Sequence, residues 1–309
     1  MRPESPSEIE IAGRRVGPAH EPFVICELSG NHNGWLARAL ALIEAAAATG
    51  CDAVKIQTYT ADTLTMDVDR PEFRIEGGLW DGRHLHDLYS EAQTPFEWHA
   101  AMFEHARRLG VTLFSTPFDE SAVDLLEDLG TPAYKIASFE AVDLPLIRYA
   151  AAKGKPLIIS TGMANLTEIE AAKNAAMDAG AAGVLLLHCV SSYPAPLEDA
   201  NLLTVPDMAA RFGCPVGLSD HTPGTAAAVA AVALAPARSR STSPCRATRA
   251  GRTRPSAWSP PSSRRSSPTA RPPGGRWGAP ITTCWGASAA TPPFAARSTW
   301  PATSPPARR

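Results

Sequence analysis

The sequence predicts an α/β protein whose residues 1–234 form a (β/α)8 barrel of the TIM type. Short apolar segments alternate with alanine- and leucine-rich helical patterns, the order that right-handed β-α-β units produce. Polar residues follow each apolar segment, at the strand ends where a barrel carries its active site. No G-x-G-x-x-G pattern follows the first apolar segment, which disfavours an open dinucleotide-binding sheet.

Seven apolar segments are predicted to be strands, because nearly continuous apolar runs are typical of parallel strands buried on both faces. They span residues 23–28, 53–58, 112–117, 133–138, 156–161, 184–189 and 215–220. Helical patterns lie between them at residues 35–50, 95–110, 120–130 and 166–180. Glycine closes these patterns, as at Gly50 and Gly110, and glycine is the usual residue after a helix end.

The composition changes abruptly at Ala235. Residues 235–309 contain 13 arginines and 14 of the chain's 29 prolines, but no aspartate, glutamate or lysine. Ile281 is the only valine, leucine, isoleucine or methionine there, so this segment cannot bury enough apolar surface to offset its ordering entropy. We therefore expect a barrel domain at 1–234 and an arginine-, proline- and serine-rich tail at 235–309.

Several classes of protein are disfavoured. No run of 18 apolar residues exists, so no membrane span is expected, and the charged N-terminus does not resemble a secretory signal. The six cysteines show no metal-type spacing, so we expect free thiols and a cytoplasmic location. Residues 1–234 hold 16 basic and 31 acidic residues, which argues against nucleic-acid binding by this part.

Barrel closure would bring the polar side chains at the strand ends to one mouth. These are Glu27, Lys55, Thr116, Lys135, Ser138, Ser160, His188, Ser191, Ser219, Asp220 and His221. Lys55 and Lys135 lie inside apolar runs, where an unpaired ammonium is costly. Two lysines among hydroxyls would form a cradle for phosphate or carboxylate.

Structural roles for the same residues stay open at this point. Each hydroxyl could merely cap the helix that follows it. His221 could be a metal ligand, a general base or a hydrogen-bonded structural histidine. The Asn-His-Asn sequence at 31–33 could belong to the site or form an asparagine-capped turn.

A set of sequence blocks in the same order resembles the N-acetylneuraminate synthase family, and within it the pseudaminic acid branch. The blocks are ELSGNHNG (27–34), VKIQTYTADTLT (54–65), LWDGRHLHDLY (79–89), STPFD (115–119), YKIASFE (134–140), ISTGMA (159–164) and GLSDHT (217–222). The resemblance covers roughly residues 8–234.

The resemblance implies condensation of phosphoenolpyruvate with the aldehyde of an amino sugar, in this branch a 2,4-diacetamido-2,4,6-trideoxy-altrose, with release of phosphate. It also implies a divalent metal, Mn²⁺ or Mg²⁺, and a homodimer for the intact family protein. The residues implied as catalytic are Glu27, Lys135 and Glu140. Those implied as substrate-binding are Lys55, Thr116, Ser138, Ser160, Ser191, Tyr193 and Ser219, and His221 is the implied metal ligand.

One expected family block is missing after residue 234. The family carries a second metal-binding histidine in an E-K-H-F-T-L block on strand eight, but no histidine follows His221 here. Codons read one base out of phase across residues 239–245 can encode that block, and residues 255–260 and 294–308 can encode later family blocks. We therefore expect a frameshift near residues 234–236, loss of strand eight and of the C-terminal antifreeze-like domain, and doubtful activity if the shift is real.

Alternative functions stay open. Within the family, the chain could be an N-acetylneuraminate or legionaminic acid synthase. A barrel that makes keto-deoxy sugar acids from phosphoenolpyruvate is a more distant alternative. Outside these classes, the chain could be an inactive remnant, or its arginine-rich tail could bind nucleic acid.

Overall fold

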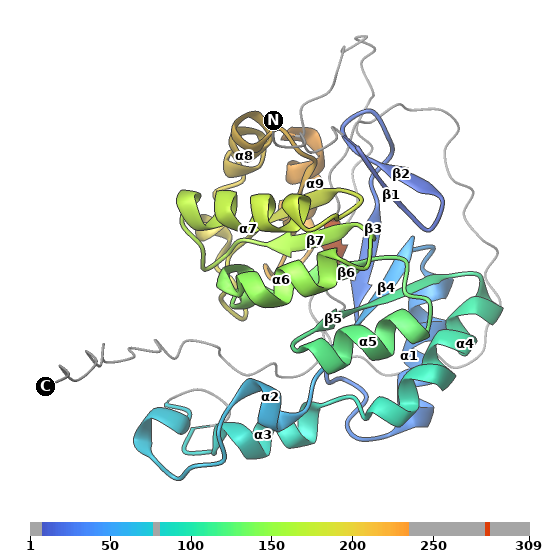
Figure 1. Ribbon diagram of the computed structural model, residues 1–309, viewed down its shortest axis with the longest axis vertical. Helices are drawn as coiled ribbons and strands as arrows, with labels where there is room; N and C mark the ends of the chain where they lie inside the picture. The colour runs from blue at the N-terminus through green and yellow to red at the C-terminus, as the bar shows by residue number, and fades with distance from the viewer. Residues whose placement is uncertain (1–7, 77–80, 235–281, 285–309) are drawn as a thin grey trace, which may run out of the picture.

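The computed structural model describes residues 8–76, 81–234 and 282–284 (Figure 1). Eight parallel strands form a closed barrel in the order β10-β3-β4-β5-β6-β7-β8-β9. The strands are β3 (Val24–Glu27), β4 (Ala53–Thr58), β5 (Thr112–Pro117), β6 (Tyr134–Ile136), β7 (Leu157–Ser160), β8 (Val184–Cys189), β9 (Val216–Ser219) and β10 (Thr282–Cys284). The (β/α)8 prediction is confirmed, and β3 to β9 each lie within a predicted segment.

Helices follow the strands and cover the outside of the barrel (Figure 1). They are α1 (Leu36–Ala48), α4 (His99–Leu109), α5 (Glu120–Asp128), α6 (Leu144–Ala151), α7 (Leu166–Asp178), α8 (Thr204–Phe212) and α9 (Ala226–Leu234). Gly110 ends α4 with φ 69°, a left-handed conformation that glycine adopts without strain. Asn165 caps α7 by accepting from the amides of Thr167 and Glu168.

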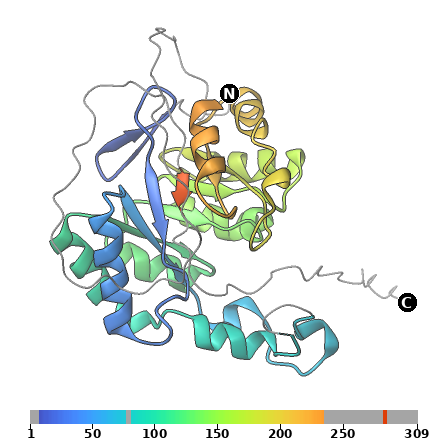
Figure 2. The same ribbon diagram turned by 180° about the vertical axis from the view of Figure 1, so that it is seen from behind.

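The eighth strand position differs from the expectation. The sequence predicted an unfilled position, but β10 pairs in parallel with β3 over three residues and with β9 over two. Figure 2 shows β10 beside β3. An open barrel would leave amide and carbonyl groups unpaired on two strand edges, and main-chain pairing by β10 satisfies them whatever its side chains are. The segment 239–245 lies outside the described residues.

An arm interrupts the regular alternation between β4 and α4. It contains α2 (Ala61–Leu64), α3 (Leu85–Ala92) and the 3-10 turns η1 (Pro71–Phe73) and η3 (Phe96–Trp98); further turns, η4 (Glu140–Val142) and η5 (Leu197–Asp199), follow β6 and β8. Figure 1 shows α2 and α3 together beyond the carboxyl end of β3. Tyr59 packs edge-on against Tyr89 and Phe118, so an aromatic cluster joins the arm to the barrel.

The barrel interior is filled by alternate residues of each strand, because successive side chains of a strand point to opposite faces. The inward residues nearer the amino-terminal ends of the strands are apolar and form a buried cluster that includes Ile25, Ala53, Phe114, Ala133, Ile158, Leu185 and Leu187. The intervening residues, such as Val54, Ile159 and Leu186, pack outward against the helices. The inward side chains that follow this apolar cluster along each strand lie toward the carboxyl ends.

A two-stranded hairpin closes the amino-terminal end of the barrel. It consists of antiparallel β1 (Ile9–Ile11) and β2 (Arg14–Val16), and Ile9, Ile11 and Val16 belong to the interior apolar cluster. Arg14 forms an ion pair with Asp52 and donates to the carbonyl of Pro22 at 2.8 Å. Asp52 also accepts from the Val24 amide at 2.8 Å, so one carboxylate joins the hairpin to β3.

Replacing this carboxylate tests the hairpin attachment. Asp52→Ala should lower the free energy of unfolding by about 2 kcal/mol, because it leaves the Val24 amide without its acceptor and the Arg14 guanidinium without its carboxylate partner. Urea denaturation followed by circular dichroism measures the change. Asp207→Ala, which removes an exposed helical pair with Arg211, is the matched control and should change stability little. Equal effects of the two substitutions would contradict the proposed attachment.

Candidate active site

The polar layer at the carboxyl end of the barrel gathers most of the predicted site residues. Each lies two positions after an inward residue, which is apolar except for Gly217 before Ser219, so each points into the barrel. The layer comprises Glu27, Lys55, Thr116, Lys135, Ser160, Cys189 and Ser219. The strand pattern thus brings six of the predicted residues together and adds Cys189.

Glu27 and Lys55 form a buried ion pair across neighbouring strands. Their side chains are each 7% exposed, and the residues are register partners on β3 and β4. Gln57 donates a hydrogen bond to the other carboxylate oxygen of Glu27 at 3.3 Å. Separating the two side chains would leave an uncompensated charge in the barrel interior, which is strongly unfavourable. The ion pair therefore holds both side chains in place.

Lys135 and Glu140 carry shifted acidities. Burial and the nearby Lys55 ammonium lower the pKa of Lys135 to about 8. Burial raises the pKa of Glu140 to about 7, and the attraction of Lys135 opposes this rise only in part. Among the described residues of the site, Glu140 is therefore a carboxyl group able to exchange a proton near neutral pH.

Three buried oxygens of the site have neither a hydrogen-bond partner nor an ion-pair partner within the described part of the chain. They are Thr116 Oγ1, Ser160 Oγ and Glu140 Oε2. Thr116 and Ser160 are each only 1% exposed. Since buried hydroxyls are nearly always hydrogen-bonded, these two are set to bond a ligand that enters beside the lysines. Neither caps a following helix, so the capping interpretation is wrong for both.

Ser138 and Ser191 meet at the loop after β7. Ser138 accepts from the Gly162 amide at 3.3 Å. A Cβ on Gly162 would lie 2.5 Å from Ser191 Oγ and 2.8 Å from the Cys189 carbonyl oxygen. Residue 162 must therefore be glycine for the β7 and β8 loops to approach this closely.

His221 and Tyr193 stack at the edge of the site, with ring centroids 4.2 Å apart. His221 Nδ1 lies 2.9 Å from the Val190 carbonyl oxygen, so it donates there and Nε2 is the coordinating atom of that tautomer. Cys189 Sγ lies 3.8 Å from His221 Nδ1. Burial alone would raise the pKa of Cys189, but His221 and Lys135 outweigh it and lower the pKa to about 7.

Other polar residues near the strand ends have structural roles. His188 faces outward, and its Nε2 lies 2.8 Å from the Ala200 carbonyl oxygen. Asp220 accepts from both the amide and the hydroxyl of Thr222. His32 is 1% exposed and bonds the Gly34 amide and the Thr94 hydroxyl, so the Asn-His-Asn sequence forms a turn fastened to the arm.

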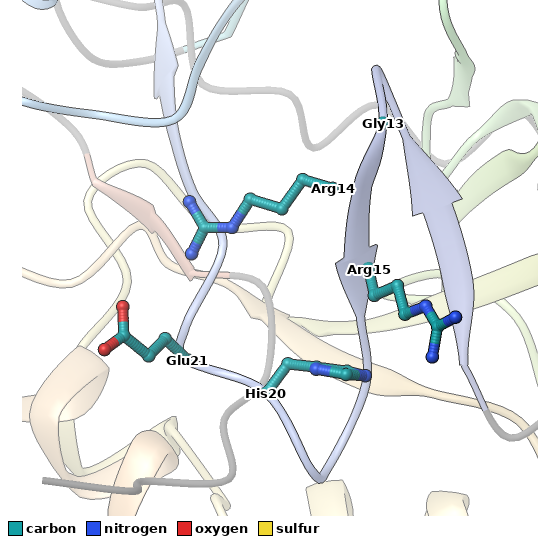
Figure 3. Close-up of a pocket in the computed structure, with 5 residues that line it drawn as sticks. All are labelled: Gly13, Arg14, Arg15, His20 and Glu21. Carbon is teal, nitrogen blue, oxygen red and sulfur yellow. The ribbon is translucent and has the colours of Figure 1, made fainter. Parts of the chain in front are cut away.

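A surface pocket at the opposite end of the barrel does not belong to this site. It is lined by Gly13, Arg14, Arg15, His20 and Glu21 beside the β1–β2 hairpin (Figure 3). Arg14 is paired with Asp52, and both Arg15 and His20 contact Glu8. The basic side chains that line this pocket are therefore already paired with carboxylates.

The residues for a metal ion are incomplete. His221 offers one imidazole, and within residues 8–76, 81–234 and 282–284 no group of three or more histidine, cysteine, aspartate or glutamate side chains could hold a metal. The same ranges contain no helix long and apolar enough to cross a membrane. The site does contain groups that can bind an anion: two buried lysines, Lys55 and Lys135, and the hydroxyls of Thr116 and Ser160, which have no partner among the described residues. We call these four side chains the anion cradle.

Comparisons with known proteins identify the family of this chain. Residues 42–237 match the model of the NeuB family. The chain is 46% identical over 213 residues to pseudaminic acid synthase from Helicobacter pylori, which covers 69% of this chain and 63% of that protein. It is 38% identical over 215 residues to N,N'-diacetyllegionaminic acid synthase from Campylobacter jejuni, covering 69% and 64%.

A solved structure shows the same fold. The N-acetylneuraminic acid synthetase of Leptospira borgpetersenii, determined in complex with citrate, superposes with a TM-score of 0.66 at 29% identity. The match covers 75% of this chain and 76% of that one. Against the Helicobacter and Campylobacter synthases, by contrast, the chain spans less than two thirds of the relative's length.

The raised pKa of Glu140 predicts a pH-dependent stability. The folded protein holds this proton more tightly than the unfolded chain, so stability should fall as pH rises from about 4.5 to about 7. Glu140→Gln should make that fall smaller by roughly 1–3 kcal/mol, because glutamine is never ionised. Urea denaturation at pH 5 and pH 7.5 measures this.

Glu198→Gln is the matched control for this experiment. Glu198 is exposed, so its substitution should leave the pH dependence of the parent protein unchanged. If Glu140→Gln retained the full loss of stability between the two pH values, a proton held by Glu140 would not be its source.

Proposed function

Because the chain belongs to the NeuB family, we propose that its barrel is the catalytic domain of a nonulosonic acid synthase that condenses phosphoenolpyruvate with the aldehyde of an amino sugar. The observation that carries this proposal is the anion cradle formed by Lys55, Lys135, Thr116 and Ser160. Phosphoenolpyruvate carries a phosphate and a carboxylate, and the cradle offers two cations and two unused hydroxyl donors. The citrate complex of the Leptospira relative supports an anionic ligand in this fold.

The reaction joins two carbons and releases phosphate. The enol carbon of phosphoenolpyruvate attacks the aldehyde carbon, water adds to the resulting oxocarbenium carbon, and the carbon–oxygen bond to phosphate breaks. Lys55 and Lys135 would neutralise the phosphate and carboxylate, and the hydroxyls of Thr116 and Ser160 would orient them. Glu140, with its pKa near 7, would exchange the proton that the added water or the aldehyde oxygen requires.

The sugar side of the site would lie toward Tyr193, Ser191 and the arm. Burial raises the pKa of Tyr193, so its hydroxyl stays protonated and can donate to a sugar oxygen. Ser138 and Ser191, held together across Gly162, would line the passage between the two substrates. Glu27 would act mainly by holding Lys55 in position.

A divalent metal, Mn²⁺ or Mg²⁺, would polarise the sugar aldehyde if it bound at His221. One imidazole without further clustered ligands among the described residues does not make a metal site, so no step above depends on the metal. The expected homodimer and cytoplasmic location also remain proposals, supported by family membership.

We propose pseudaminic acid synthase as the specific activity, since identity is higher to the Helicobacter pseudaminic acid synthase than to the Campylobacter legionaminic acid synthase. With the reading frame restored after residue 234, the purified protein should release phosphate from phosphoenolpyruvate with 2,4-diacetamido-2,4,6-trideoxy-altrose at a kcat/KM at least about tenfold above that with N-acetylmannosamine. Lys135→Met should abolish release with both sugars. Preference for the mannosamine would assign the chain to the sialic acid branch instead.

The two unpartnered hydroxyls allow a test of the cradle that separates binding from folding. Ser160→Ala should raise the Kd for phosphoenolpyruvate about tenfold, since a hydrogen bond to a charged group is lost. The free energy of unfolding should not fall and should rise slightly, because Ser160 Oγ has no partner among the described residues and a buried hydroxyl without a partner costs stability. Isothermal titration calorimetry and urea denaturation measure the two quantities.

Ser115→Ala is the matched control on the neighbouring outward face. Ser115 Oγ bonds Thr58 Oγ1 at 2.6 Å and donates to the Ile56 carbonyl at 3.1 Å. Its loss should lower the free energy of unfolding by about 1–2 kcal/mol and leave the Kd for phosphoenolpyruvate unchanged. The opposite pattern for the two serines would remove the main support for the proposed function.

The proposed frameshift concerns residues 235–309. The family match ends at residue 237, close to the change in composition, and this supports a change of reading frame near residues 234–236. Resequencing the codons for residues 232–240 tests it, and a miscounted base would restore the second histidine. If the sequence stands, the 309-residue chain should show little synthase activity.

A further inference from the structure

Cys189 occupies an inward position of the polar layer that the proposed mechanism does not use. It is the last residue of β8, two positions after the inward Leu187, and it is the register partner of Ser219 on β9. It is 6% exposed. Its side chain therefore faces the barrel interior, as those of Lys135 and Ser160 do, rather than the helices.

The immediate neighbours of the thiol define its place in the site. Cys189 Sγ lies 3.8 Å from His221 Nδ1 and 3.9 Å from Ser191 Oγ. The loop after β7 approaches closely, because a Cβ built on Gly162 would lie 3.2 Å from Cys189 Cβ and 2.8 Å from the Cys189 carbonyl oxygen.

A second observation indicates that a ligand belongs in this layer. Thr116 Oγ1 and Ser160 Oγ are buried, point inward like Cys189, and have no partner within the described part of the chain. A ligand that bonds both hydroxyls while facing Lys135 fills the interior that the β8 thiol also faces.

We propose that Cys189 is a wall of the phosphoenolpyruvate site, so that bound phosphoenolpyruvate and a small group attached to the sulfur exclude each other. This inference rests on the proposed function, and it adds a ligand-contacting residue and a covalent modification site. The sulfur provides an apolar, polarisable contact for the methylene end of the enol, while the lysines and hydroxyls hold its charged groups.

A methylthio group is the smallest useful probe of this wall. Methyl methanethiolsulfonate reacts with the thiol to form a methyl disulfide on Cys189. The new sulfur–sulfur bond replaces the one within the reagent, methanesulfinate leaves, and the thiol proton is released to the solvent. The modified side chain gains one sulfur and one carbon.

The experiment measures the rate of this labelling in the full 309-residue protein, peptide by peptide, by mass spectrometry. With phosphoenolpyruvate at ten times its Kd, only about one eleventh of the protein has an empty site, so labelling of Cys189 should slow about elevenfold. Cys51, whose Sγ donates to the Ala46 carbonyl on the outer helix layer, should be labelled at an unchanged rate. Fully labelled protein should no longer bind phosphoenolpyruvate in calorimetry, and dithiothreitol should restore binding.

Two variants complete the design. Cys189→Ser removes the sulfur contact, so it should bind phosphoenolpyruvate with a raised Kd, and treatment with the reagent should leave that Kd unchanged. Cys51→Ser should behave like the parent protein in both protection and loss of binding. Binding that survived complete labelling of Cys189, or binding without protection of Cys189, would overturn the inference and leave the proposed function intact. Failure of the unmodified protein to bind phosphoenolpyruvate at all would overturn both.

Discussion

The burial of two ammonium groups inside one barrel is the constraint on which the rest of the site depends. Lys55 and Lys135 are 6% and 8% exposed, and an isolated charge at such positions would be strongly unfavourable. Glu27 compensates Lys55 directly, whereas Lys135 has its pKa lowered toward neutrality. The apolar layer beneath them keeps water out and strengthens every interaction of the charges above it.

The position of the polar layer could be predicted from the sequence because strand periodicity is strict. Once 53–58 is a strand with Ala53 inward, Lys55 must also face inward, and the same holds for Ala133 and Lys135. A polar residue at the end of a strand belongs to the site only if it also lies on the inward face. His188 does not, because its neighbours Leu187 and Cys189 point inward and His188 must point outward. The same parity places Cys189 inward, whereas the spacing of the cysteines indicates only a free thiol.

Two features had no local signal in the sequence. β10 pairs with β3 and β9 through main-chain atoms, and these strands lie far apart in the chain. No side-chain pattern therefore predicts this pairing. The missing hydrogen bonds of Thr116 and Ser160 are likewise properties of the folded surroundings. Hydroxyls left unsatisfied cost stability, and their presence beside two lysines is typical of a site organised for its ligand before binding.

The β1–β2 hairpin determines from which end of the barrel a polar ligand can approach the site. Because Ile9, Ile11 and Val16 belong to the interior apolar cluster, their side chains fill the amino-terminal end of the barrel, and the polar residues of the site lie toward the carboxyl end. A polar molecule that approached from the hairpin side would have to displace this apolar packing, so the carboxyl end is the side on which a ligand can meet Lys55 and Lys135.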